Sequence, residues 1–148
     1  FSKVCNCMIR EIEKSDLNDN YFNLLLQLSG ESKPYNVYNI WESYLNGSSK
    51  TFVYELLGKI VGSSSVFIEN KFLHYGSSVG HIEDAVVDRH CRTKGIGKLL
   101  INTCLEYAKQ RECYKIILDC SEQNIPFYVK CGFMPDGYCM RCDWKGKP

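Results

Sequence analysis

The chain has 148 residues, is 45% hydrophobic and 24% charged, and carries a net charge of +1 at neutral pH. A chain of this length buries about 70% of its unfolded surface when it folds as one domain, so we expect a single domain over residues 1–148. The small net charge gives no reason to expect nucleic acid or an anionic membrane as a partner. With no apolar run near the ~18 residues of a membrane span and no signal-peptide pattern, we expect a cytoplasmic protein.

Nine cysteines are many for a domain with enough hydrophobic residues to build a core. Their odd number and this hydrophobic content favour reduced thiols over a disulfide framework. Cys139 and Cys142 form a C-x-x-C motif, but no second such motif accompanies it, and in a strand the two side chains would face opposite sides. His74, His81 and His90 lack ligand-like spacing. We therefore expect no metal.

The first half of the chain is predicted to contain strands and helices in alternation. We expect a strand at 7–12, a helix N-capped by Ser15 or Asp16 and running to about 28, a short helix at 34–45, and strands at 51–57 and 59–69. Gly58 separates the last two strands, which indicates an antiparallel hairpin. Residues 69–78 are predicted to be a connection.

The second half begins with a strand at 81–88 and an amphipathic helix. Apolar residues recur at Ile96, Leu100, Cys104 and Ala108, which is helical spacing. We expect further strands at 114–120 and 138–144, with a short helix after Asn124. The whole pattern predicts an α/β fold with six strands in a mixed, partly antiparallel sheet and helices after the first, fourth and fifth strands.

The turn at 92–98, with the sequence RTKGIGK, is the most informative segment. Unpaired amides at the start of a helix attract anions, and glycines at 95 and 97 let a bulky diphosphate approach the backbone. Arg92, Lys94 and Lys98 add positive charge. By itself, such a turn is also compatible with a simple helix start.

Several motifs in order carry a resemblance to a known family. Strand, R-x-x-G-x-G turn, helix, strand and N-x-x-[FY]-Y-x-K-x-G-F resemble the GNAT superfamily of acetyl-CoA-dependent N-acetyltransferases. Residues 80–84, 113–120 and 127–133 are similar to the glucosamine-6-phosphate N-acetyltransferases within it. The resemblance implies a GNAT fold, with a mixed, mostly antiparallel central sheet flanked by helices. It also implies acetyl-CoA as co-substrate, glucosamine 6-phosphate as acceptor, direct attack by the sugar amine, and a homodimer.

The resemblance assigns one set of residues to acetyl-CoA. These are Val86, Val87, Arg92, Thr93, Lys94, Gly95, Ile96, Gly97, Lys98, Asn124, Tyr128 and Lys130. Tyr128 would also act as the acid that protonates the departing thiolate, because a tyrosine hydroxyl is a donor at neutral pH. The alternatives are that Tyr128 only packs beside Phe127, and that Asn124 caps a helix.

Three carboxylates stand on strands that are otherwise apolar, where an unpartnered charge is costly to bury. They are Glu83, Asp84 and Asp119. Residues four apart share a strand face, so Lys115 and Asp119 are expected to face the same side. Glu83 and Asp84 cannot both face one side, so either one is structural or a β-bulge re-aims them. The resemblance implies that all three contact the sugar, with Asp119, Glu83 and Tyr128 as the catalytic residues.

The remaining acceptor residues that the resemblance implies would bind the sugar and its phosphate. They are Ser29, Lys71, Phe72, Leu73, His74, Tyr114, Lys115 and Arg141. Lys71, His74 and Lys115 are the candidates for the 6-phosphate. Arg141 would replace a basic C-terminal residue of the family, at whose position Asp143 stands. Two alternatives remain open, namely a GNAT enzyme acting on a peptide or lysine amine, and a non-catalytic CoA-binding module.

Overall fold

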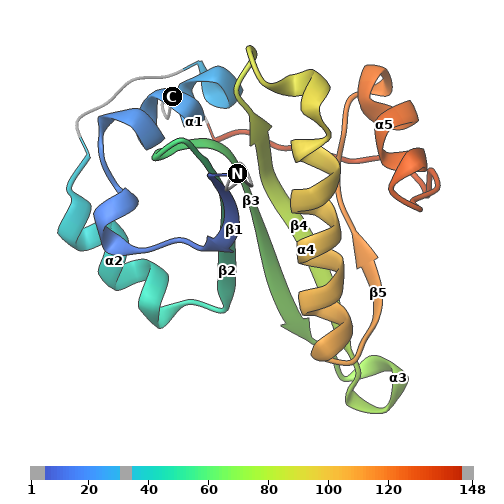
Figure 1. The fold of residues 1–148 in the computed structure, drawn as a ribbon. Coiled ribbons are helices and arrows are strands. Elements are labelled where there is room, and N and C mark those ends of the chain that lie inside the picture. The colour runs from blue at the N-terminus through green and yellow to red at the C-terminus, as the bar shows by residue number, and fades with distance from the viewer. Residues whose placement is uncertain (1–5, 31–34, 145–148) are drawn as a thin grey trace. The chain divides into compact units, whose positions relative to one another are not determined.

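The computed structural model describes residues 6–30 and 35–144 (Figure 1). The chain divides into two compact units, Phe1–Leu118 and Asp119–Pro148. The first unit contains a five-stranded sheet and most of the helices. No helix within the described ranges combines the length and the apolar character needed to cross a bilayer.

The sheet of the first unit is mixed and mostly antiparallel. Its strands are β1 (Cys7–Glu11), β2 (Ser49–Leu56), β3 (Lys59–Asn70), β4 (Ser78–Val87) and β5 (Cys113–Ile117), in the spatial order β1-β2-β3-β4-β5. The first four pair antiparallel, and β5 pairs parallel to β4. A parallel pair needs a crossover connection, which a long helix supplies here. The predicted sheet type and hairpin are confirmed.

The helices of the first unit follow β1, β3 and β4. They are α1 (Asp19–Ser29), α2 (Val37–Asn46), the one-turn α3 (Leu73–Gly76) and α4 (Ile96–Gln110), with 3₁₀ turns η1 (Lys14–Asp16) and η2 (Arg92–Lys94). The helices predicted after the first and fourth strands are confirmed. The segment predicted as a plain connection contains α3, whose His74 and Tyr75 adopt left-handed backbone conformations.

The N-cap of α1 is Asn18 rather than Ser15 or Asp16. The Asn18 side chain accepts a hydrogen bond from the Tyr21 amide at 3.3 Å. Asp16 instead binds the Arg10 guanidinium through both carboxylate oxygens, at 2.7 and 2.8 Å. The predicted cap is wrong because this ion pair, formed with β1, uses the carboxylate that would otherwise cap the helix.

Two adjacent serines of β3 show how the helices cover the sheet. The Ser63 hydroxyl lies 3.1 Å from the Tyr21 hydroxyl of α1, and the Ser64 hydroxyl lies 3.6 Å from the Cys104 sulfur of α4. Successive side chains of a strand point to opposite faces. Helices α1 and α4 therefore cover opposite faces of the sheet (Figure 1).

A hydrophobic core lies on each face. On the α1 side, the buried cluster is Ile12, Tyr21, Leu24, Val53, Ile60 and Val86. On the other side, α4 buries Ile96, Leu100, Ile101, Cys104 and Ala108, which confirms the helical spacing read from the sequence. A Cβ atom at Gly62 would lie only 2.8 Å from Leu100 Cδ1, so the missing side chain lets α4 pack closely on β3.

The second unit contains η3 (Glu122–Asn124) and α5 (Ile125–Lys130). The helix predicted after the fifth strand is therefore confirmed. The strand predicted at 138–144 is wrong, because this segment carries no strand in the structure. A strand requires a neighbouring strand for its backbone groups to pair with, which the local sequence does not reveal.

Candidate active site

The turn between β4 and α4 presents backbone amides at the start of a helix. The first α-helical hydrogen bond runs from the Leu99 amide to the Gly95 carbonyl, at 3.2 Å. The amides of Ile96, Gly97 and Lys98 precede it, and no side chain caps them. Gly95 has φ 75°, a left-handed conformation that glycine adopts without strain. The structure thus forms the uncapped helix start that the sequence predicted, with the geometry of an anion site.

Asp88 holds this turn against helix α1. Its Oδ2 accepts a hydrogen bond from Gln27 Nε2 at 2.9 Å, and its Oδ1 accepts one from the His90 amide at 2.8 Å. The Gln27 oxygen in turn accepts from the Arg89 amide at 3.0 Å. The His90 amide and then Gln27 hold the pKa of Asp88 below its ordinary value. The charged carboxylate therefore tethers the turn.

Of the basic residues of the turn, only Arg92 is tied to the backbone. Its Nε donates to the Val87 carbonyl at 3.1 Å, which places the guanidinium beside the end of β4. Lys94 and Lys98 are exposed, and no carboxylate of the described residues lies within 4.0 Å of either ammonium group. Their positive charge remains available to an anion at the helix start.

A β-bulge interrupts β4 at the predicted carboxylates. The register of β3 against β4 shifts between Ser63 and Ser65, and Asp84 has φ 52°. Bulges of this kind re-aim side chains that would otherwise alternate. The structure therefore shows the bulge that sequence reasoning gave as one of two alternatives. Glu83 and Asp84 are both exposed.

Asp84 lies close enough to Tyr21 to affect its ionisation. Tyr21 is only 6% exposed, and burial raises the pKa of its hydroxyl. The negative charge of Asp84 raises that pKa further, against the lowering effect of the hydrogen bond with Ser63. The charge of the bulged carboxylate therefore acts on the α1 side of the sheet.

β4 and β5 stop pairing halfway along β4. Their parallel pairing ends at His81 opposite Ile117, while β4 continues to Val87. The backbone groups of residues 82–87 on the side of β5 therefore pair with no strand, and an extended ligand can bond to such an edge. Because β5 ends at Ile117, Asp119 is not part of the strand. The prediction that it shares a strand face with Lys115 is wrong.

Two of the predicted phosphate contacts gather at Tyr114. The His74 ring of α3 lies 4.4 Å from the Tyr114 ring of β5, and Lys115 Nζ lies 5.7 Å from the same ring centre. All three side chains are exposed. The structure thus places a histidine and a lysine from distant segments around one aromatic ring.

Lys71, the third predicted phosphate contact, is ion-paired with Glu69. Its Nζ lies 2.6 Å from Glu69 Oε1, while His81 Nε2 lies 2.7 Å from Glu69 Oε2. Lys71 first and His81 second hold the pKa of Glu69 below its ordinary value. Sequence reasoning missed Glu69. Residues two apart in a strand share a face, so the spacing of Glu69 and Lys71 could have indicated this ion pair.

The other acceptor candidates of the first unit lie at the surface. Ser29 is the last residue of α1, as predicted, and its hydroxyl donates to the Leu25 carbonyl at 3.4 Å. Phe72 and Leu73 are 105% and 67% exposed. Such exposure of a phenylalanine is unusual for a surface that contacts only water.

Tyr128 of α5 is half-buried between two phenylalanine rings. Phe127 lies 4.9 Å away and Phe133 6.0 Å away, both edge-on. Burial, followed by the nearby Cys120 and Cys131, raises the pKa of Tyr128. The ring packs as the alternative interpretation expected, and the hydroxyl remains a proton donor at neutral pH. Its role as the acid stays a prediction.

The remaining candidates of the second unit are exposed. Asn124 occupies the N-cap position of α5 but makes no side-chain capping hydrogen bond, so the capping alternative is wrong. Asp119 and Lys130 face solvent within this unit. Arg141 Nε pairs with Asp143 Oδ1 at 2.7 Å, so Arg141 has an acidic partner within its own segment.

No group of three or more His, Cys, Asp or Glu side chains within residues 6–30 and 35–144 is arranged to hold a metal ion.

The family model described as Acetyltransferase (GNAT) family matches residues 11–133, which is most of the chain. The chain belongs to the GNAT family.

Individual relatives narrow this assignment. The chain is 41% identical over 145 residues to glucosamine 6-phosphate N-acetyltransferase of Trypanosoma brucei brucei, covering 95% of this chain and 97% of the relative. It is 33% identical to the enzyme of the same name from Candida albicans, covering 90% and 93%. The crystal structure of glucosamine-6-phosphate N-acetyltransferase from Arabidopsis thaliana superposes with a TM-score of 0.86 at 35% identity, covering 94% of this chain and 99% of that one.

The comparison confirms the GNAT resemblance and the GNAT fold. The features that the sequence did not reveal in this GNAT protein are Gln27, Asp88 and Glu69, each of which holds another residue in place. A polar residue next to a predicted site gives no sign of its partner when that partner lies far away in the chain.

Proposed function

We propose that this GNAT enzyme transfers the acetyl group of acetyl-CoA to the amine of D-glucosamine 6-phosphate. The products are N-acetyl-D-glucosamine 6-phosphate and CoA, and the reaction would be a step of UDP-GlcNAc biosynthesis. The observation that carries the proposal is the 41% identity, over nearly the full length of both chains, to a relative of that name.

The start of α4 fits the diphosphate of acetyl-CoA. Its uncapped amides and the exposed Lys94 and Lys98 favour an anion, and Gly95 leaves the approach open because nothing lies within 4 Å of a Cβ built there. The unpaired edge of β4 at Val86 and Val87 offers hydrogen-bonding groups to the pantetheine arm. The resemblance to the family implies that Asn124, whose side chain caps no helix, and Lys130 also contact acetyl-CoA.

The reaction needs no covalent acyl-enzyme. The acceptor amine attacks the thioester carbonyl, the C–N bond forms, and the C–S bond breaks. Asp119 and Glu83 orient the amine, the proton that the amine loses passes to solvent water, and Asp84 attracts the amine to the bulge. Tyr128 protonates the departing thiolate, a role that fits its raised pKa because the hydroxyl stays protonated at neutral pH.

The acceptor phosphate would be bound by His74, Lys115 and Lys71. The first two already lie around Tyr114, and a charged donor strengthens each hydrogen bond to a phosphate oxygen. Lys71 would exchange part of its interaction with Glu69 for the phosphate. Two or three such contacts give a preference for the phosphorylated sugar over free glucosamine.

The proposal extends to the assembly and its place in the cell. Residues 1–148 would act as one GNAT domain, since the family match runs across the boundary at Leu118. The cytoplasmic location rests on the sequence alone, whereas a homodimer is supported by large apolar side chains that are exposed within their own units. These include Phe72 (105% exposed), Tyr75 (108%), Tyr138 (97%), Met140 (91%) and Trp144 (79%).

An acceptor panel tests the proposed function. The protein is incubated with acetyl-CoA and either glucosamine 6-phosphate, glucosamine or a lysyl peptide, while CoA release is followed and the product mass is measured. We expect fast CoA release with glucosamine 6-phosphate and a product heavier by one acetyl group. Fast turnover of the peptide alone would indicate a GNAT enzyme for another amine, and binding of acetyl-CoA without turnover of any acceptor would indicate a non-catalytic module.

A further inference from the structure

A depression of about 620 Å³ lies in the first unit, between α2, the strand ends and the end of α4. Its volume falls in the range of about 300 to 1,000 Å³ that is typical of small-molecule sites. Its lining includes Lys14, Trp41, Tyr44, Ile68, Tyr107 and Arg111. None of its lining residues belongs to the residues assigned above to acetyl-CoA or to the acceptor.

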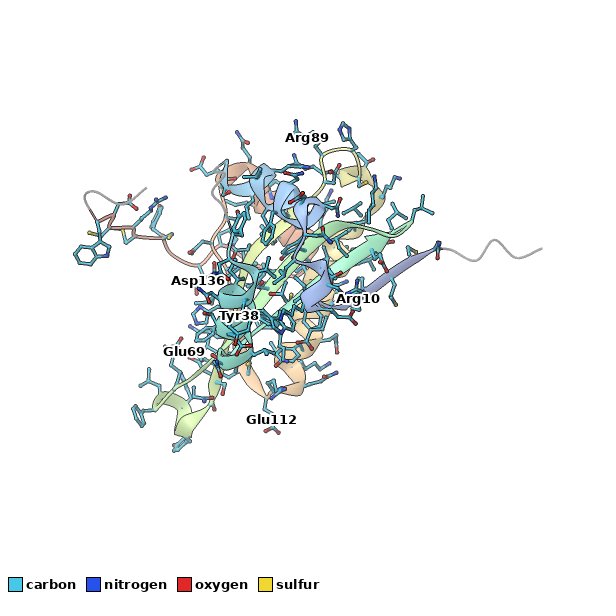
Figure 2. All side chains as sticks on the ribbon, turned by 90° about the vertical axis from the view of Figure 1, so that its left-hand side faces the viewer. Arg10, Tyr38, Glu69, Arg89, Glu112 and Asp136 are labelled. Carbon is cyan, nitrogen blue, oxygen red and sulfur yellow. The ribbon has the colours of Figure 1, made fainter. Side chains whose placement is uncertain are left out.

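The depression lies at the opposite end of α4 from the anion-binding turn. Helix α4 starts at Ile96, next to the turn, and ends at Gln110, next to the lining residue Arg111. At 1.5 Å per residue, the two ends are about 20 Å apart. Figure 2 shows Arg89, which precedes the turn, at one end of the sheet, and Glu69 and Glu112 at the other. A ligand in the depression is therefore separate from the proposed acetyl-CoA diphosphate.

Aromatic rings form much of its wall. The Trp41 and Tyr44 rings of α2 lie 5.3 Å apart, and Tyr107 of α4 packs edge-on against Phe52 at 5.8 Å. Ile68 of β3 adds apolar surface to the lining. Flat apolar walls of this kind favour a ligand with a planar ring.

Both acidic side chains of the lining are already bound within the fold. Glu11 Oε1 accepts from Lys50 Nζ at 2.8 Å and from the Tyr44 hydroxyl at 3.0 Å. The Glu13 side chain accepts the backbone amide of Asp16 in a capping box. Lys50 offsets the charge of Glu11, whereas Glu13 keeps its negative charge, so the lining carries three cations (Lys14, Lys50 and Arg111) against two carboxylates.

The cations of the lining include two without an acidic partner. The Arg111 guanidinium carbon lies 4.9 Å from the Tyr107 ring centre, and Lys14 Nζ lies 5.4 Å from the Tyr38 ring centre. Among the described residues, no carboxylate lies within 4.0 Å of either group. A cation at position 111 is expected at the end of α4. Here its guanidinium also lies over the Tyr107 ring, and Arg111 lines the depression.

We propose that this depression is a second ligand site, which binds a small aromatic anion. The ring of the ligand would pack against Trp41 and Tyr107, and its carboxylate or phosphate would bind Arg111 and Lys14. The proposal does not depend on the acceptor of the acetyl transfer, because it uses no residue of that site.

Trp41 provides a direct reporter of binding. The chain has two tryptophans, Trp41 and Trp144, so a Trp144→Phe variant leaves Trp41 as the single fluorescent indole. The probes are phenyl phosphate and phenylacetate, with neutral phenylacetamide as the uncharged control. We expect saturable quenching by at least one anion, with binding at least about tenfold tighter than that of phenylacetamide. The tighter of the two anions identifies phosphate or carboxylate as the natural group.

Two variants in the Trp144→Phe background locate the anion contact. Arg111→Gln should weaken binding of the tighter anion about tenfold or more, whereas Lys109→Gln, an exposed cation on the same helix that does not line the depression, should leave it unchanged. Acetyl-CoA at saturation should not displace the anion. The proposal is overturned by absence of saturable quenching, by equal affinity for phenylacetamide, by equal loss in both variants, or by displacement with acetyl-CoA.

Discussion

The side-chain nitrogen of Gln27 in α1 lies 2.9 Å from Asp88 Oδ2, just beyond β4. With the bond from the Arg89 amide to the Gln27 oxygen, this contact fixes the turn that leads to the start of α4. The amides proposed to bind the diphosphate thus follow a turn that is hydrogen-bonded to a glutamine of another helix.

Replacing Gln27 by Leu should weaken acetyl-CoA binding without unfolding the protein. Two hydrogen bonds are lost, each worth about 1 kcal/mol, and part of this loss is transmitted to the turn, so the Kd should rise about fivefold. Calorimetry with acetyl-CoA measures the change. Gln110→Leu, at the far end of α4, serves as the control, and an unchanged Kd in Gln27→Leu would show that the turn does not need this tether.

Gly97→Val should block acetyl-CoA binding more severely. A β-branched side chain in the first turn of α4 would occupy the approach of the diphosphate to the amides. We expect the Kd to rise by about a hundredfold or more, as for loss of two charge-assisted hydrogen bonds, with the circular dichroism spectrum retained. Leu99→Val, on the exposed side of the same helix, should bind normally. A folded Gly97→Val variant with wild-type affinity would place the diphosphate elsewhere.

Tyr128→Phe should lower kcat and leave acetyl-CoA affinity nearly unchanged. Only the hydroxyl is removed, and an acid of this kind typically contributes about 10²-fold to 10⁴-fold. Because burial raises the pKa of Tyr128, wild-type kcat should hold through neutral pH and fall only as the pH rises through that raised value. A decrease below about threefold, with chemistry rate-limiting, would reduce Tyr128 to a packing residue.

The Arg10–Asp16 ion pair should stabilise the fold. Asp16 is 7% exposed and binds Arg10 at 2.7 and 2.8 Å, so Asp16→Asn should lower the free energy of unfolding by about 2 kcal/mol. The exposed pair of Lys50 with Glu11 is the control, and Glu11→Gln should cost about 1 kcal/mol or less. Equal losses in urea denaturation would contradict the assignment.

The same ion pair predicts a pH dependence. The hydrogen bond from Arg10 lowers the folded-state pKa of Asp16. Its stabilisation is therefore complete above the unfolded value of about 3.9 and is lost as the pH falls through the lower folded value. The difference in stability between wild type and Asp16→Asn should shrink in acid. A difference that grew at low pH would mean that the folded pKa is raised instead.

Elements with strong local signals could be predicted from the sequence. The period of Ile96, Leu100, Cys104 and Ala108 identified the face of α4 that the sheet buries, because a helix needs only its own residues to define that face. The turn with Gly95 and Gly97 before α4 could also be predicted, because a turn is defined by its own residues. The bulge at Asp84 was foreseen as an alternative, since two adjacent carboxylates conflict with strand alternation.

Features that depend on a distant partner could not be predicted. The cap of α1 moved to Asn18 because Asp16 pairs with Arg10 on β1, and no local pattern announces that pairing. Residues 138–144 are predicted as a strand, but they form no strand in the described structure. The contacts of Gln27 with Asp88 and of Glu69 with His81 likewise arise only when the sheet brings distant segments together.

The most direct test of the proposed function compares kcat/KM for glucosamine 6-phosphate and for free glucosamine. If His74, Lys115 and Lys71 bind the phosphate, two charge-assisted contacts of about 1.5 to 3 kcal/mol each predict a preference of about a hundredfold or more. Lys115→Ala should reduce kcat/KM for the phosphorylated sugar much more than for glucosamine, whereas Lys109→Ala should change neither. Equal kcat/KM for the two sugars in the wild-type protein would contradict the proposal that this enzyme acts on a sugar phosphate.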